Sequence, residues 1–223
     1  MKIKAEQSPK PAMYKRVPNR DRHPRGHFPS TKTGTLLPYW CELDRAALLI
    51  AEVDSTVAYF ERCDELFAVI NDNGDRFVFE PFLSLLRTDG RRGMLFCGNA
   101  ALAVKFDPVV KRSLEATLSK RRFHVQTVTN QSITESSALD NANLIDRYSR
   151  IRLTGDMRDE IEGAYGEEST MPLFLLERAL GGRIAGNATI CTGVAAGLLQ
   201  FDIDPPLEPG TPITLVKKEF GHA

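Results

Sequence analysis

Two apolar runs separated by a turn dominate the middle of the chain. The run from Phe77 to Leu86 is aromatic and aliphatic and holds Glu80 as its only carboxylate, and Met94 to Cys97 is a second apolar run. Between them, residues 87–93 contain an Asp-Gly pair, which favours the tight turn of a β-hairpin. The pattern therefore predicts two paired strands, with a single acid in the first.

The segments around this hairpin alternate between helical and strand patterns. Tyr39 to Glu52 places Leu43, Ala47, Ile50 and Ala51 on one helical stripe. Asp107-Pro108 is a typical helix start, because Asp caps the free N–H groups and Pro fits the first turn. The expected elements are a helix at 39–52, strands at 57–61 and 65–70, a turn at 71–75, a helix from Pro108 with Val110, Leu114 and Leu118 buried, and a strand at 123–129. They predict a compact α/β unit ending near residue 130.

Helical patterns fill the chain after residue 133. They cover 139–153, 156–165, 172–180 and 187–199, and Gly181-Gly182 breaks the last two apart. An acidic, Pro-rich loop at 201–209 and an extended segment at 211–216 follow. Two short helices joined by a glycine turn and followed by a hairpin-like tail favour a small winged-helix-like domain over residues 133–223.

Residues 1–38 carry six prolines and no helical or strand period, so they are expected to form an extended arm. Residues 1–34 hold nine Lys and Arg against Glu6 and Asp21, a net charge of +7, and the remainder of this balanced chain is −7. Segregated positive charge favours contact with nucleic acid, and the alternative is a solvated tail. The candidate DNA contacts are Lys15, Arg16, Arg20, Arg22, Arg25 and Lys32 in the arm, and Arg121 and Arg122 at the end of the second helix.

Composition narrows the class of protein further. The 223 residues suffice for one domain or two small ones. No window approaches the roughly 18 apolar residues of a membrane span, and the basic N-terminus lacks the apolar region of a secretory signal. The four cysteines are widely spaced without a CxxC pair, which argues against a zinc knuckle and a disulfide framework. A soluble protein of the (bacterial) cytoplasm is expected, with no membrane partner.

Four segments together resemble the TnsA-like transposon endonucleases. They are GHFPSTKTG (26–34), YWCELDRAALLIAEVDSTVAYF (39–60), RFVFEPFLSLLRTDGRR (76–92) and FHVQTVT (123–129). The resemblance implies an α/β (α+β) fold of the PD-(D/E)xK, restriction-endonuclease-like type, with a mixed sheet flanked by helices over residues 39–132 and a helical C-terminal domain. It also implies a function: cutting DNA at the ends of a mobile element, beside a DDE transposase subunit.

The resemblance also implies a site, and the sequence departs from it. In the family, a helix acid and two strand ligands bind Mg²⁺ while a lysine orients the attacking water. The helix acid matches Asp44, with Glu42 as a close substitute, and the first-strand acid matches Glu80; Asp44 and Glu80 are the expected metal ligands. The second-strand acid and lysine fall on Phe96 and Gly98. A different register restores a lysine, Lys105, and still lacks the acid.

Three hypotheses follow. In the first, the chain is a TnsA-like subunit that binds DNA and docks a transposase, with cleavage impaired or lost. In the second, it is an active Mg²⁺-dependent nuclease using Glu42 or Asp44, Glu80 and Lys105. In the third, it is an adaptor that binds no nucleic acid. Structural roles compete with each site residue: Glu80 as an ion-pair partner of Arg76 or Arg87, and Glu42 and Asp44 as helix-start acids. Helix 187–199 holds no Lys or Arg, which favours partner docking over DNA reading there.

Overall fold

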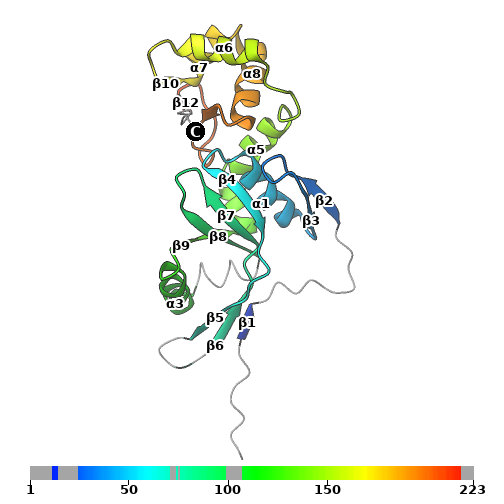
Figure 1. Cartoon of the computed structure of the whole chain (residues 1–223), viewed down its shortest axis with the longest axis vertical. Coiled ribbons are helices and arrows are strands. Elements are labelled where there is room, and N and C mark those ends of the chain that lie inside the picture. Colours follow the sequence, from blue (N-terminus) through cyan, green and yellow to red (C-terminus); the bar gives the residue numbers. More distant parts are fainter. Residues whose placement is uncertain (1–11, 15–24, 71–73, 75, 99–106, 217–223) are drawn as a thin grey trace, which may run out of the picture.

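A four-stranded mixed sheet forms the centre of the molecule (Figure 1). The computed structural model describes residues 12–14, 25–70, 74, 76–98 and 107–216. The strand order is β4 (Val57–Arg62), β7 (Leu83–Arg87), β8 (Arg92–Cys97) and β9 (Phe123–Val128). The first three are antiparallel neighbours, and β9 runs parallel to β8. The order helix, hairpin strands, helix, strand is the one predicted for this region.

Helices cover the two faces of this sheet. Side chains alternate along β8, so that Leu95 and Cys97 join the core of α1 (Glu42–Val53), while Met94 and Phe96 join the core of α3 (Pro108–Ser119). The predicted cap of α3 is confirmed, because the Asp107 carboxylate accepts hydrogen bonds from the N–H groups of Val109 and Val110. The sheet thus separates an α1 side from an α3 side.

The predicted single strand from Phe77 to Leu86 is wrong. It forms two strands, β6 (Arg76–Phe79) and β7, which belong to different sheets. The break follows from Pro81, which has no N–H for the ladder and constrains the residue before it. Strand β6 pairs instead with β5 (Phe67–Ile70), antiparallel, and with β1 (Ala12–Tyr14). Of the turn expected at 71–75, all but Gly74 lies outside the described residues.

The extended arm expected over residues 1–38 is also wrong for residues 25–38, and the helix expected from Tyr39 begins at Glu42. Strands β2 (Gly26–Pro29) and β3 (Leu36–Tyr39) form an antiparallel hairpin, and Phe28 lies opposite Leu37. Both side chains are buried in the core on the α1 side. With only one buried apolar residue in each strand, the pattern is short and is hidden among prolines in the sequence.

The C-terminal part is a helical unit with its own small sheet. Its helices are α4 (Asn130–Glu135), α5 (Ala138–Asp146), α6 (Gly155–Tyr165), α7 (Leu173–Ala179) and α8 (Arg183–Ala195). The predicted helices at 139–153 and 187–199 differ from α5 and α8, which end at Asp146 and begin at Arg183. The antiparallel strands β10 (Thr170–Pro172), β12 (Pro212–Leu215) and β11 (Leu199–Gln200) lie in that order; β10, β11 and α4 were not predicted.

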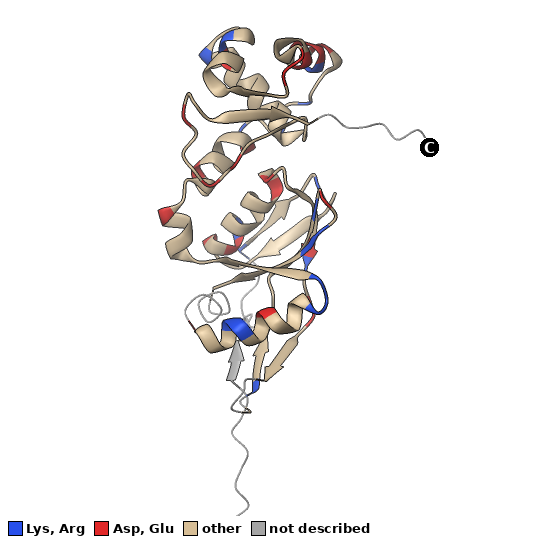
Figure 2. Cartoon of the chain, turned by 90° about the vertical axis from the view of Figure 1, so that its left-hand side faces the viewer, with Lys and Arg blue, Asp and Glu red and all other residues tan. Residues whose placement is uncertain are grey.

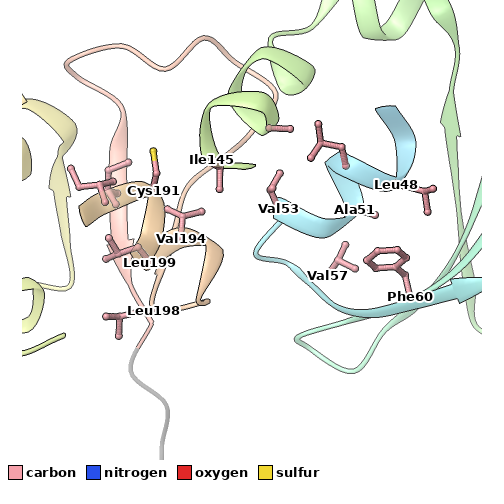
Figure 3. Close-up of a cluster of buried hydrophobic side chains, with 14 of the residues drawn as sticks. Leu48, Ala51, Val53, Val57, Phe60, Ile145, Cys191, Val194, Leu198 and Leu199 are labelled. Atoms are coloured by element: carbon pink, nitrogen blue, oxygen red, sulfur yellow. The ribbon is translucent and has the colours of Figure 1, made fainter. Parts of the chain in front are cut away.

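One core joins this unit to the central sheet. Helix α5 packs on both α1 and α8. Figure 3 shows Ile145 of α5 between Val194 of α8 and Val53 of α1, all three buried. The side-chain amide of Asn141 donates to the carbonyls of Ile203 and Pro205, which fixes the loop before β12 to α5. Among the residues that the structure describes, no helix is long and apolar enough to cross a membrane.

The predicted break at Gly181-Gly182 is confirmed, and it brings α7 against α8 at Gly186. A Cβ at Gly186 would lie 2.8 Å from the Cα and carbonyl oxygen of Glu177. Gly186→Val is therefore expected to lower the free energy of unfolding by about 2 to 3 kcal/mol, because backbone cannot yield as a side-chain end can. Urea unfolding measures the change. Gly163→Val, where a Cβ meets no atom within 4 Å, is the control; equal effects in both would contradict the close contact.

Candidate functional site

Three segments that are distant in sequence meet at one end of the central sheet. The thiol of Cys97, at the end of β8, lies 3.9 Å from the carbonyl oxygen of Leu43 in the first turn of α1. The N–H of Phe82, at the β6–β7 junction, donates to the carbonyl of Leu95 at 2.7 Å. The start of α1, the junction holding Glu80 and the end of β8 are therefore neighbours.

Asp44 is buried and acts within its own helix end. One carboxylate oxygen accepts the N–H of Trp40 at 2.9 Å, and the other accepts the thiol of Cys41, also at 2.9 Å. Cys41 is the N-cap of α1, so Asp44, three residues later, ties down the residues that precede the helix. Glu42 is exposed in the same turn, where a carboxylate favours the positive end of the helix dipole.

Arg62, which was not predicted as a site residue, lies where these three segments meet. The Arg62 guanidinium lies over the rings of Phe82 and Trp40, with its central carbon 4.5 and 5.2 Å from their centroids. Burial lowers the pKa of Arg62, and the neighbouring Glu80 carboxylate opposes that shift. An arginine remains a cation throughout the physiological range. Its Nη1 is buried without a hydrogen-bond partner among the described residues. The positive charge near Glu80 is thus supplied by the Arg62 side chain.

Phe96 and Gly98 occupy the positions expected to hold the second acid and the lysine. The Phe96 ring is fully buried on the α3 side, where it packs edge-to-face with Phe79 at 6.2 Å. It therefore lies on the face of the sheet opposite α1, and Cys97 is the β8 residue beside α1. Gly98 follows with φ +63°. Lys105 lies outside the described residues.

The described residues do not fit a magnesium site. Mg²⁺ requires hard oxygen ligands and holds its waters tightly. Both Asp44 oxygens already accept hydrogen bonds, the β8 position offers sulfur, and a guanidinium lies beside Glu80. Within the ranges described, no three His, Cys, Asp or Glu side chains form a group able to hold a metal ion. We therefore derive no chemistry through a metal here.

The candidate DNA contacts divide into three groups. Lys15, Arg16, Arg20 and Arg22 lie outside the described residues. Arg25, Arg121 and Arg122 are exposed. Lys32 instead donates to the carbonyls of Ala51 and Asp54, at 2.9 and 2.6 Å, at the end of α1, and burial lowers its pKa to about 8. Its ammonium belongs to the α1 helix end and does not project from an arm.

Glu52 is a second charged residue whose role was not predicted from the sequence. It is buried near the end of α1 and accepts hydrogen bonds from the hydroxyl groups of Ser30 and Thr31 and from the N–H groups of Thr31 and Lys32. A carboxylate between Ala51 and Val53, together with the polar run Ser30-Thr31-Lys32, was the available signal. Its role is structural, since it clasps the β2–β3 hairpin to α1.

Comparisons with known proteins add no family. Neither the models of protein families nor the sequences of curated proteins contain a match to this chain.

Proposed function

We propose that the chain is a TnsA-like subunit of a heteromeric transposase that binds DNA at mobile-element ends and docks a DDE transposase, and that its strand cleavage is lost. The observation that carries this proposal is Arg62. Its guanidinium is held over the rings of Phe82 and Trp40, where the start of α1, the β6–β7 junction and the end of β8 meet, and it interacts electrostatically with Glu80. A half-buried cation there opposes the binding of a second cation, because like charges in a partly desolvated site repel each other.

The architecture supports the nuclease-like part of the proposal. The helix α1, strands β4, β7 and β8, helix α3 and strand β9 build a mixed sheet with a helix on each face. Asp44 and Glu80, matched from the resemblance alone, come to the same end of that sheet. The placement of these two acids, about 36 residues apart in the chain, on neighbouring segments supports a nuclease ancestry for the scaffold.

The C-terminal unit supports docking to a protein. Its order α6, β10, α7, α8, β11, β12 favours a winged-helix-like arrangement, with α8 in the place of a reading helix. Helix α8 and loop 201–211 together hold one cation, Arg183, against Asp202, Asp204 and Glu208. A helix that reads DNA needs nearby cations to bind phosphates, whereas the carboxylates of loop 201–211 would repel a phosphate backbone. Phe174 and Ile184 are 48% and 90% exposed, which suits a protein partner.

A cleavage assay tests the loss of activity. The purified chain is incubated with element-end DNA and Mg²⁺ or Mn²⁺, alone and with its transposase, and strands are resolved on denaturing gels. We expect the DNA to be bound without nicking by this chain, with Glu80→Ala and the exposed control Glu115→Ala both indistinguishable from the unsubstituted protein. Nicking that Glu80→Ala abolishes and Glu115→Ala preserves would overturn the proposal.

An active nuclease is the second candidate, and the shared location of Asp44 and Glu80 is the observation in its favour. It requires Glu42 or Asp44, Glu80 and Lys105 to work with Mg²⁺. The same assay separates it from the first candidate. The third reading, an adaptor that binds no nucleic acid, predicts negligible and salt-independent DNA binding.

A further inference from the structure

Two turns that lie side by side carry a cluster of cations. Arg91 ends the β7–β8 turn and Arg92 is the first residue of β8, while the α3–β9 turn contributes Lys120, Arg121 and Arg122. The parallel pairing of β8 with β9 places Arg92 opposite Phe123, so the two turns meet at the start of both strands. All five side chains are exposed. We call these five residues the basic edge; Figure 2 shows blue segments of both turns at the same end of the sheet.

Two of these arginines are held in place by aromatic rings. The Arg92 guanidinium lies over Phe123, 4.6 Å from its centroid, and that of Arg121 lies over Phe67 at 5.6 Å. Phe67 is buried and Phe123 packs against the same core on the α3 side. A guanidinium seated on a fixed ring loses less freedom when it binds an anion. The basic edge is therefore preorganised by the core beneath it.

Only part of this positive charge is neutralised within the chain. Asp89 pairs with Arg91 at 2.5 Å and Glu65 with Arg121 at 3.8 Å. Among the described residues, no carboxylate lies within ion-pair distance of Arg92, Lys120 or Arg122. Arg122 also has φ +60°, a conformation that is uncommon outside glycine and is worth a functional explanation. An excess of three positive charges remains on the edge.

We infer that the basic edge binds backbone phosphates of duplex DNA; this rests on the proposed function and adds where the DNA is held. Arginine suits this role because its planar fork matches phosphate oxygens. A duplex is favoured over an anionic membrane because the guanidinium groups cover the aromatic rings, which leaves those rings unable to enter a bilayer. Residues 138–216, with six Lys and Arg against twelve Asp and Glu, carry the opposite charge and lie above the sheet (Figure 2).

The basic edge is separate from the site of Asp44 and Glu80. Arg92 begins β8 and Cys97 ends it, a distance of about 17 Å at roughly 3.3 Å per residue. The Phe123 ring beneath Arg92 packs on the α3 side, whereas Cys97 contacts α1 on the other face. DNA held by the edge is therefore gripped away from the nuclease-like site.

Salt-dependent binding of the full chain to a fluorescent duplex of about 20 base pairs tests the inference, with NaCl varied from roughly 50 to 200 mM. We expect Arg92→Ala/Arg121→Ala to weaken binding about tenfold or more, and to reduce the slope of log affinity against log salt by about 2, since each lost phosphate contact removes about 0.9. The control is Arg150→Ala/Arg178→Ala, which removes the same charge from exposed sites of the C-terminal unit and should bind like the unsubstituted chain. Arg92→Lys/Arg121→Lys should keep the slope and bind between these extremes.

The outcomes separate the edge from the proposed function. If the Arg92/Arg121 alanine variant matches its control in affinity and slope, while deletion of residues 1–24 abolishes binding, the edge inference fails and DNA binding by the chain stands. If the unsubstituted chain binds no duplex at the lowest salt, the proposed function fails as well. Loss of binding to vesicles of anionic lipid in the same variant, with DNA binding unchanged, also overturns the inference and assigns the edge to membranes.

Discussion

Glu52→Ala is expected to lower the free energy of unfolding by about 3 to 4 kcal/mol, the largest effect of any single substitution proposed for this chain. The buried Glu52 carboxylate accepts the Ser30 hydroxyl at 2.6 Å, the Thr31 N–H at 2.8 Å and the Thr31 hydroxyl. Its removal leaves several partly buried donors unsatisfied, and each such donor costs about 1 to 3 kcal/mol. The half-buried Lys32 ammonium also loses a neighbouring opposite charge.

Urea unfolding measures this change, with Glu61→Ala as the control because Glu61 is exposed on β4. The substitution should also open the β2–β3 hairpin, so limited proteolysis should cut within residues 30–35 sooner than in the unsubstituted chain. An effect below about 1 kcal/mol, the range of surface substitutions, would contradict the role of Glu52 as a clasp.

Asp44→Ala is expected to lower the free energy of unfolding by about 2 kcal/mol and the unfolding midpoint by about 4 to 8 °C. The reason is that the Asp44 carboxylate accepts the Trp40 N–H and the Cys41 thiol from a buried position. The sign of the change is informative. A carboxylate kept for a metal is strained in the metal-free protein by neighbouring acids, so its removal stabilises. Thermal unfolding of metal-free protein distinguishes the two roles.

Glu42→Ala provides the comparison for Asp44, because Glu42 is exposed in the same helical turn and should change stability by less than about 1 kcal/mol. A neutral or stabilising Asp44→Ala substitution would show that the capping contacts contribute little. The hypothesis of a retained metal ligand would then gain support.

Local signals predicted much of this fold. Asp107-Pro108 started α3, Asp89-Gly90 formed the β7–β8 turn, and Gly181-Gly182 separated α7 from α8. Each of these turns and helix ends is determined by a few neighbouring residues, through their backbone preferences. Pro81 was also a signal in the sequence, because a proline inside a strand pattern predicts the break between β6 and β7.

The remaining elements depend on contacts that sequence periodicity does not contain. Phe28 and Leu37 form strands because α1 covers them, and strands β10 and β11 are three and two residues long and are stabilised by β12. Such elements have too few residues to display a period. These short strands are therefore determined by tertiary packing, which sequence periodicity does not reveal.

The candidate site was predicted in part. The resemblance named Asp44 and Glu80 as candidate ligands, which stays a prediction, and it did not indicate the side of the sheet on which Phe96 lies. A one-residue change of register moves a strand side chain to the other face, and no local signal set that register. Arg62 was missed because its partners Trp40 and Phe82 are about 20 residues away on either side, and cation–π contacts leave no sequence pattern.

Calorimetric titration of the full chain with Mn²⁺ tests the central claim most directly. With a guanidinium near Glu80 and both Asp44 oxygens accepting hydrogen bonds from Trp40 and Cys41, we predict no saturable heat up to about 1 mM metal, and the same flat titration for Glu80→Gln and Asp44→Asn. One Mn²⁺ bound per chain below about 1 mM, with binding lost in both substituted proteins, would contradict the claim and support the hypothesis of an active nuclease.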